Sequence, residues 1–441
     1  MKKNARETAL EVLTACRKLD AWSDGSLKSA CQRNGLDRRE AAMAARLTYG
    51  ILQNMALLDF YLGQYCSQKF SQLEPFVRDV LRLGAYQILM MDKVPDSAAV
   101  NEAVEMAKHH KRARAAGMIN AVLRRLSREK DSLPAIAERP VEEYLALRYS
   151  HPVWLVKRLL EILGREEAEA FLAADNEPVP LTIQRNPLRC SREELLDYWQ
   201  KAGAVITPHS WLEDCYELTG TGSLEEQEAF RAGWFQVQDA AAKVAALAAG
   251  AKEGDSVIDV CAAPGGKSFA AAMEMNNRGR IRSFDIHPHK LALIESGAER
   301  LGITCVETAL GDGRENIEAL NGSADVVICD VPCSGLGIIR KKPDIRYKDP
   351  KALAALPGIQ RAILENACRY VKSGGVLLYS TCTILPEEND GLVSAFLAEH
   401  PEFHTEAISV PSLEGGEEGR MTLWPQRHRT DGFYLCKMRK V

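Results

Sequence analysis

Residues 326–335 read Val326-Val327-Ile328-Cys329-Asp330-Val331-Pro332-Cys333-Ser334-Gly335. The apolar run that opens this stretch is typical of a strand buried on both faces of a parallel sheet. In open α/β sheets, ligands bind just beyond the carboxyl ends of such strands. The stretch therefore predicts an α/β domain in which Asp330 and Cys333 lie at the binding edge.

A second apolar run, residues 375–381, ends directly before Cys382. If its strand is a neighbour of the first, Cys382 lies at the same edge of the sheet as Cys333. Free cysteines are most often small core residues, and we interpret Cys329 and Cys368 in that way. Two thiols beside a carboxylate at one sheet edge indicate chemistry instead.

The region around these runs alternates strands and helices, which indicates a doubly wound, Rossmann-like parallel sheet over residues 239–441. Residues 433–437 are expected to close this sheet as an antiparallel strand, and the Gly- and Glu-rich residues 411–422 to form a loop. The remaining strands are predicted at residues 256–260, 281–284 and 305–309.

The rest of the chain predicts two further domains. Residues 1–135 show helical periodicity throughout, with a capping box at Asp37 and Glu40, and indicate an all-α bundle. Residues 136–238 indicate a small α+β module with the order strand, helix, two strands, helix, strand. Ser191 and Glu194 form the capping signal of its first helix.

Composition is that of an ordinary soluble protein: 441 residues, of which 46% are hydrophobic and 26% charged. No uncharged apolar segment is long enough to span a membrane, and residues 1–7 lack the apolar core of a signal peptide, so we expect a cytoplasmic protein. The 12 cysteines contain no Cys-x-x-Cys pair. We therefore expect reduced thiols, with no disulfide framework and no metal site. We also expect a monomer.

Charge is divided unevenly along the chain. The net charge is −4, yet residues 1–130 hold 22 Lys and Arg against 14 Asp and Glu. Basic side chains gather at residues 109–114 and 124–130. A single basic side chain on a helix usually indicates only exposure, but clustering in one basic domain favours contact with a polyanion.

Residues 261–268 form a small-residue turn after the strand at 256–260. A phosphate-binding P-loop would require glycine where Cys261 stands, and the Gly-x-Gly-x-x-Gly pattern of dinucleotide sites is absent. Asp285, at the end of the next strand, has the position of an acidic residue that hydrogen-bonds ribose hydroxyls. With Asp312 and Asp330, three consecutive strands end in aspartates, which favours a nucleoside cofactor.

These motifs resemble those of the NOL/NOP/Sun family of S-adenosylmethionine-dependent RNA cytosine-5 methyltransferases. The resemblance is carried by residues 261–267, 330–335 and 380–382, in the family's order. Residues 5–9 and 118–124 are similar to the NusB-type helical RNA-binding domain. Together they point to the family's bacterial RsmB (Sun, Fmu) group, which methylates 16S ribosomal RNA.

The resemblance implies a role for each matching position. Cys382 would be the nucleophile, Cys333 would assist product release, and Asp330 would face both cofactor and target base. Asp285 would bind the ribose of S-adenosylmethionine and Asp312 its adenine. Its methionine part would be bound by Cys261, Ala262, Ala263, Pro264, Gly265, Gly266 and Lys267.

Two further segments match family motifs, with small departures. Residues 340–347 match the basic segment after the Pro-Cys motif, and residues 424–434 match the C-terminal motif. At four positions this chain has a residue other than the one usual in the family, and we expect these departures to affect only the fine positioning of RNA. These positions are Ala324, Val326, Tyr347 and Thr383.

The chemistry explains why these residue types are needed. Carbon 5 of cytosine is too weak a nucleophile to accept a methyl group until a thiolate has added to carbon 6. By the resemblance that thiolate is Cys382, which can act only if its pKa is lowered, and Lys267 is the nearest cation by motif. Asp330, if protonated or donating through a partner, would stabilise charge on the ring nitrogen. The target base must also leave its stack, which favours a single-stranded loop.

Three alternatives stay open. The target could lie in another RNA, a transfer RNA or the large-subunit ribosomal RNA. A DNA cytosine-5 methyltransferase would use Cys333 as its nucleophile, although the basic helical domain and Cys382 argue against it. A ribosome-assembly factor that binds RNA without catalysis is the third, although Cys382, Asp330, Asp285 and Lys267 argue against it.

Overall fold

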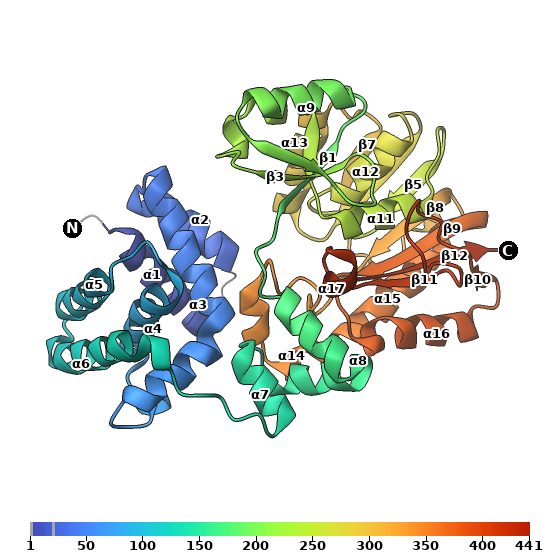
Figure 1. Ribbon diagram of the computed structural model, residues 1–441. Helices are drawn as coiled ribbons and strands as arrows, with labels where there is room; N and C mark the ends of the chain where they lie inside the picture. Colours follow the sequence, from blue (N-terminus) through green and yellow to red (C-terminus); the bar gives the residue numbers. More distant parts are fainter. Residues whose placement is uncertain (1–2, 20–22) are drawn as a thin grey trace. The chain divides into compact units, whose positions relative to one another are not determined.

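The computed structural model describes residues 3–19 and 23–441, and these form two compact units (Figure 1). The first unit contains the chain up to Glu177 together with Ile339–Lys348, and the second contains Pro178–Ile338 and Asp349–Val441. This division differs from the expected boundaries, because residues 136–177 are helical and group with the N-terminal bundle. Within the described residues, no helix combines the length and the apolar character that a membrane crossing needs.

The first unit is entirely helical, as its periodicity predicts. The side chains of Leu47, Ile51, Leu58 and Leu62, which mark that periodicity, are all fully buried. The helices are α1 (Ala5–Leu19), α2 (Ser23–Asn34), α3 (Arg38–Tyr65), α4 (Pro75–Met90), α5 (Asp96–His109), α6 (Ala113–Glu129), α7 (Val141–Arg148) and α8 (Val153–Ala174).

The predicted capping box at the start of α3 is only half formed. The Asp37 side chain accepts a hydrogen bond from the Glu40 amide at 2.9 Å, as an N-cap should. The Glu40 carboxylate instead accepts from the amide of Ala5, at 2.6 Å. It therefore satisfies an unpaired N–H at the first turn of α1, which sequence spacing alone does not reveal.

Ile339–Lys348 forms a short segment, the strap, in which the chain leaves the second unit and joins the first. The strap contains the 3₁₀ turn Pro343–Tyr347, where the Arg346 side chain is only 1% exposed. Its guanidinium donates to the carbonyl oxygens of Gln53 (2.6 Å) and Ser150 (3.1 Å) and to Asn176 Oδ1 (2.7 Å). Arg346 therefore links three parts of the helical unit through buried hydrogen bonds.

Truncating Arg346 should destabilise the helical unit, because its carbonyl partners would be left buried without donors. We expect Arg346→Ala to lower the free energy of unfolding by about 2–4 kcal/mol, as for loss of a buried charged hydrogen-bond network. Chemical denaturation followed by circular dichroism measures this. The control is Arg128→Ala on the exposed face of α6. An equal effect in both variants would contradict the role of Arg346.

The second unit begins with the predicted α+β module. Its four strands form an antiparallel sheet of order β2-β3-β1-β4, and the predicted order of elements is confirmed. The capping box of Ser191 and Glu194 is complete, with both hydrogen bonds present. The elements are β1 (Leu181–Arg185), α9 (Arg192–Lys201), β2 (Val205–Pro208), β3 (Cys215–Thr219), α10 (Glu228–Arg231) and β4 (Phe235–Val237).

The remainder of the second unit is an eight-stranded sheet of order β10-β12-β9-β8-β5-β6-β7, with β11 paired to β12. The five strands from β9 to β7 are parallel, and β12 is antiparallel to β9, as predicted. The strands are β5 (Ser256–Asp259), β6 (Arg280–Asp285), β7 (Val306–Leu310), β8 (Ala324–Asp330), β9 (Val371–Thr381), β10 (Phe403–Thr405), β11 (Arg420–Leu423) and β12 (Phe433–Lys440).

Two details of this region differ from expectation. The strand β12 does not close the sheet, because β10 and β11 both pair with it. The segment expected to be a loop at 411–422 ends in the strand β11, which starts at Arg420. Its Met421 and Leu423 side chains are buried in the core, and this burial stabilises a strand that its Gly- and Glu-rich context conceals.

Both faces of the large sheet are covered by helices, which explains its continuous apolar strands (Figure 1). Alternate side chains enter different cores: Val257 and Ile328 lie in one, Ile258 and Cys329 in the other. The first core includes α11 (Ala240–Ala249), α12 (Gly266–Glu274) and α13 (Pro288–Leu301), and the second α15 (Leu356–Tyr370) and α16 (Asp390–Glu399). The short helices α14 (Pro350–Leu353) and α17 (Pro425–His428) complete the unit.

Candidate active site

The sheet order gathers the predicted site residues along one edge. In spatial order, β9 leads to Cys382, β8 ends at Asp330, β5 leads to the turn at 261–267, β6 ends at Asp285 and β7 precedes Asp312. Because these five strands are parallel, their carboxyl ends meet at the same edge. Asp285 and Asp312, the candidate residues for binding a nucleoside, thus lie at one end of this row, and the two cysteines lie at the other end.

The turn at 261–267 depends on Gly265. This residue has a φ of +106°, and a Cβ there would lie 2.3 Å from the Phe269 ring. A side chain is therefore excluded both by the backbone conformation and by lack of space. The turn leads directly into α12, which begins at Gly266. The two glycines therefore leave the backbone at this point of the sheet edge uncovered by their own side chains.

Beneath this turn lies Asp259, the last residue of β5, which is 1% exposed. One carboxylate oxygen accepts from Ser268 Oγ at 2.7 Å. Burial raises the pKa of Asp259 to about 7. The carboxyl group is thus a buried support of the turn, while Cys261 beside it is a thiol whose pKa is raised by burial.

Asp330 is held between two donors. Its Oδ2 lies 2.6 Å from Lys267 Nζ and its Oδ1 accepts from Ser380 Oγ at 2.7 Å. Burial alone would lower the pKa of Lys267, but the Asp330 carboxylate and, more weakly, Cys382 raise it above its usual value. Lys267 is therefore an ammonium, and its Nζ also lies 5.1 Å from the centre of the Phe433 ring.

The two cysteines meet as predicted. β8 and β9 are parallel neighbours with Asp330 opposite Ser380, and Cys333 Sγ lies 3.2 Å from Cys382 Sγ. Both residues are partly exposed. The hydrogen bond with Cys382, followed by burial, raises the pKa of the Cys333 thiol well above its usual value. The contact with Cys382 and burial thus both favour the protonated form of Cys333.

Asp285 and Asp312 occupy the predicted strand ends, and both also organise their own loops. Asp285 is 8% exposed and accepts from the His287 amide at 2.9 Å. Asp312 is paired with Arg314, whose hydrogen bonds lower the pKa of the Asp312 carboxyl. The side chains that follow Asp285 and precede Asp312, Ile286 and Leu310, are 49% and 58% exposed.

Sequence reasoning missed a group of buried polar residues behind the cysteines. Glu388 and Gln360 bind the loop of Cys333, and Ser334 Oγ lies 2.6 Å from Thr383 Oγ1. Gly337 approaches Gly432 so closely that a Cβ on Gly337 would lie 1.9 Å from the Gly432 carbonyl oxygen. The only available signal was the position of Glu388 six residues after Cys382, in an otherwise ordinary acidic turn.

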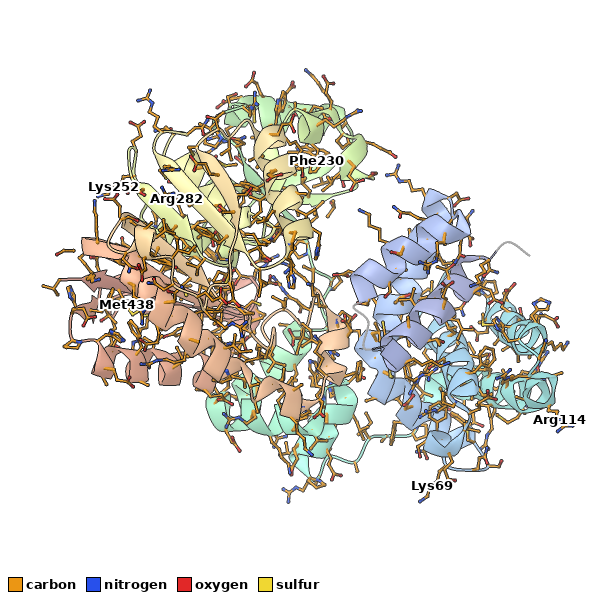
Figure 2. The ribbon with its side chains drawn as sticks, turned by 180° about the vertical axis from the view of Figure 1, so that it is seen from behind. Lys69, Arg114, Phe230, Lys252, Arg282 and Met438 are labelled. Carbon is orange, nitrogen blue, oxygen red and sulfur yellow. The ribbon has the colours of Figure 1, made fainter. Side chains whose placement is uncertain are left out.

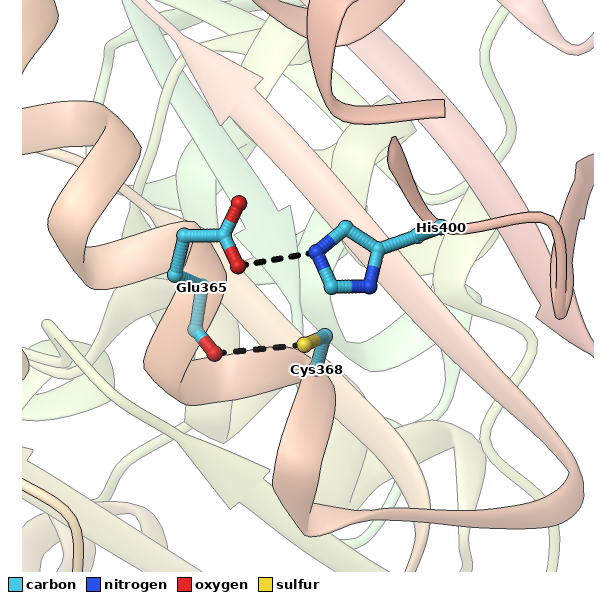
Figure 3. A group of neighbouring side chains, drawn as sticks. All are labelled: Glu365, Cys368 and His400. Atoms are coloured by element: carbon cyan, nitrogen blue, oxygen red, sulfur yellow. Dashed lines mark hydrogen bonds and ion pairs between the residues drawn. The ribbon is translucent and has the colours of Figure 1, made fainter. Parts of the chain in front are cut away.

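A second cluster on the same unit contains Glu365, Cys368 and His400, whose ligand atoms lie within 4.8 Å of one another (Figure 3). A metal would require a deprotonated thiol and a neutral imidazole. Burial instead raises the pKa of Cys368 to about 11, and Arg361 is paired with Glu365. The cluster is therefore an ion-pair group centred on His400.

His400 bridges two acidic side chains. Its ring nitrogens lie 2.8 Å from Glu365 Oε2 and 3.0 Å from Glu402 Oε1. Burial opposes the charged form, but the two carboxylates outweigh it and raise the pKa of His400 above its usual value. The charged His400 therefore stabilises the folded protein. This contribution is complete below the pKa of about 6.5 that His400 has in the unfolded chain, and it is lost as pH rises through the higher pKa of the folded state.

Replacing His400 should therefore change the pH dependence of stability. We expect the free energy of unfolding of His400→Gln to lie below that of the wild type at pH 6, and this difference to shrink by pH 9. Denaturant unfolding at both pH values measures it. The control is His404→Gln on the exposed side of β10. A His400→Gln difference that is independent of pH would show that the bridge is uncharged.

Comparison with known protein families identifies three matching segments. Residues 3–128 match the NusB family, residues 151–225 the ferredoxin-like domain of RsmF/B-like methyltransferases, and residues 246–439 the family 16S rRNA methyltransferase RsmB/F. The expected all-α bundle, small α+β module and Rossmann-like domain are thus confirmed.

Among solved structures, that of PH0851 superimposes with a TM-score of 0.83 and 27% identity, covering 99% of this chain and 98% of that one. NSun6 from Pyrococcus horikoshii with SFG has a TM-score of 0.59 and 25% identity, covering 66% of this chain and 98% of that one. The resemblance to the Sun family that the motifs indicated is confirmed.

Two curated relatives span nearly all of the chain. The probable ribosomal RNA small subunit methyltransferase B of Bacillus subtilis is 38% identical over 100% of this chain and 99% of its own length. The ribosomal RNA small subunit methyltransferase B of Sodalis glossinidius is 34% identical over 92% of this chain and 91% of its own. The chain therefore belongs to the 16S rRNA methyltransferase RsmB/F family.

Proposed function

We propose that this protein transfers a methyl group from S-adenosylmethionine to carbon 5 of a cytosine in 16S ribosomal RNA, through a covalent bond from Cys382 to carbon 6. The observation that carries the proposal is the contact of Cys333 and Cys382 at 3.2 Å, just beyond β8, the strand that ends at Asp330 of the Lys267–Asp330 pair. Family membership supports the coarser activity, and this geometry supports the finer one.

The residues at the other end of the row fit a nucleoside cofactor. Asp285 and Asp312 offer carboxylates for polar groups, while the exposed side chains of Ile286 and Leu310 offer apolar surface for a base. The turn that ends in Gly265 brings backbone close without a side chain. S-adenosylmethionine, when bound, supplies an electrophilic methyl group.

The thiol pair divides the chemistry between two residues. Cys382 forms a bond to carbon 6, and the electron pair of the carbon 5–carbon 6 double bond becomes available at carbon 5. After methylation, the proton on carbon 5 is removed, the double bond re-forms and the bond to Cys382 breaks. Cys333, a thiol in contact with the Cys382 sulfur, is in place to assist that release.

Lys267 and Asp330 stabilise the charge that develops on the cytosine ring. Both Asp330 side-chain oxygens accept hydrogen bonds, one from Lys267 and one from Ser380, so Asp330 is placed as an acceptor. The positive charge of Lys267, held by Asp330 and felt by Cys382, favours both the thiolate and the negative charge on the ring. Of the two expected routes for Asp330, the structure supports donation through a partner.

The helical unit supports ribosomal RNA as the substrate. Its helices α5 and α6 and the turn between them carry Lys108, Lys111, Arg112 and Arg114, and Figure 2 shows Arg114 at the outer surface. Such a group suits contact with phosphates. The names of the Bacillus and Sodalis relatives favour the small-subunit RNA over transfer RNA or large-subunit RNA.

Single replacements of the two cysteines test the proposal. We expect Cys382→Ala to abolish both methyl transfer and any covalent protein–RNA species, because no adduct can form. We expect Cys333→Ala to methylate and then retain the RNA covalently. The measurement uses 16S RNA from a strain lacking the enzyme, radiolabelled S-adenosylmethionine and denaturing gels.

The buried Cys329 provides the matched control, since Cys329→Ala should neither lose methyl transfer nor trap RNA. If Cys382→Ala accumulated adduct and Cys333→Ala did not, Cys333 would be the nucleophile, as in the DNA enzymes. If the wild type neither methylated nor formed adduct, the role of a non-catalytic assembly factor would be favoured.

Cofactor binding can be tested without RNA. We expect Asp285→Ala to weaken binding of S-adenosylmethionine by about 1.5–3 kcal/mol, the scale of hydrogen bonds to a charged group. Isothermal titration calorimetry on the full chain measures it, with Asp197→Ala on the exposed face of α9 as control. Unchanged affinity in Asp285→Ala would remove this residue from the cofactor site.

A further inference from the structure

Behind the two cysteines lies Glu388, a buried carboxylate that the chemistry above does not use. Glu388 ends the short 3₁₀ turn Pro386–Glu388 after Cys382, and it is 1% exposed. Its Oε2 accepts from the backbone amide of Ser334 at 2.9 Å and from Gln360 Nε2 at 2.7 Å. Burying a carboxylate is costly, so these hydrogen bonds must compensate for lost hydration.

Glu388 and Gln360 hold the backbone on both sides of Cys333. Gln360, on α15 and fully buried, also donates to the carbonyl oxygen of Pro332 at 3.0 Å. The Pro332 carbonyl belongs to the peptide group before Cys333, and the Ser334 amide belongs to the one after it. One carboxylate and one amide therefore restrain both peptide groups that flank the Cys333 Cα.

The same carboxylate belongs to the loop that carries Cys382. The Glu388 carbonyl oxygen accepts from the Tyr379 hydroxyl at 2.7 Å, which ties the turn back to β9. The Gly337 amide donates to the Cys382 carbonyl oxygen at 2.9 Å. The Glu388 side chain is thus one of few direct links between the loops that present the two thiols.

The charge of Glu388 also acts on Cys333. The hydrogen bond with Cys382 and burial raise the pKa of Cys333, and the negative charge of Glu388 adds to the effect. A protonated Cys333 suits a role after methyl transfer better than a role as nucleophile. The other carboxylate oxygen, Oε1, has no hydrogen-bond partner among the described residues.

We infer that Glu388 is a positioning residue for product release: with Gln360 it holds the Cys333 thiol against Cys382, so that the covalent bond to the base can break. The inference rests on the proposed function, because it assigns Cys382 to bond formation and Cys333 to release. Glu388 acts through its hydrogen bond with the backbone amide of Ser334.

The test compares adduct formation with adduct decay in the full-length protein. We expect Glu388→Ala to slow decay of the covalent complex on the order of 10- to 100-fold, the scale of misplacing a reacting group by about 1 Å. The rate of adduct formation should change by less than about threefold, because Cys382 directly follows β9 and its position does not depend on the Cys333 loop. The probe is 16S RNA lacking the modification, with radiolabelled S-adenosylmethionine, sampled over time on denaturing gels.

Two further variants keep the test decisive if Glu388→Ala folds poorly. Glu388→Gln can still accept from Ser334 and Gln360 through its carbonyl oxygen, and should restore decay to near the wild-type rate. Gln360→Ala removes the link to Pro332 from a different helix and should slow decay selectively. The control is Asn186→Ala, which removes a buried side-chain amide that binds the Gly233 and Leu301 carbonyls.

Three outcomes would overturn the inference. Adduct decay at the wild-type rate in Glu388→Ala would show that Cys333 needs no support from this residue. Equal slowing of formation and decay, as in Asn186→Ala, would indicate a merely structural role. Failure of Glu388→Gln to restore decay would rule out the hydrogen bonds as the cause. Cys333→Ala runs in parallel: if it traps no adduct, the proposed function fails, whereas trapping there but not in Glu388→Ala defeats only the inference.

Discussion

The parallel pairing of β8 with β9 is the constraint on which the site depends. Its register places Asp330 opposite Ser380. From that alignment Ser380 reaches the Asp330 carboxylate, and the loops beyond bring Cys333 and Cys382 into contact. A slip of one residue would turn every side chain of a strand to the other face, so the two helical layers that cover the sheet also protect the alignment of the site.

Charge in the site is arranged in pairs whose members depend on each other. Asp330 raises the pKa of Lys267, and the two Asp330 carboxylate oxygens accept hydrogen bonds from Lys267 and Ser380. The hydrogen bond with Cys382, burial and the negative charge of Glu388 all raise the pKa of the Cys333 thiol. Acid–base roles thus follow from neighbours across the sheet edge and not from the residue types alone.

Much of the fold could be predicted because its signals are local. Continuous apolar runs mark strands covered on both sides, and the 3.6-residue period marks the helices of the first unit. The misses occurred where distant residues decide. Glu40 caps α1 instead of completing its own box, and β11 forms because Met421 and Leu423 are buried. Arg346 lies in a segment that the sequence marks only as basic, yet its buried guanidinium donates to carbonyl oxygens from three separate parts of the chain.

The sequence by itself determined which residue types end each strand, and therefore the aspartates, the lysine and the two cysteines of the candidate site. It did so because strand ends and tight turns are encoded within a few neighbouring residues. Only the tertiary structure decided the order in which those ends meet, the partner of each charge and the support of Cys333 by Glu388 and Gln360. These depend on hydrogen bonds between segments 28 to 63 residues apart, whose geometry no local pattern contains.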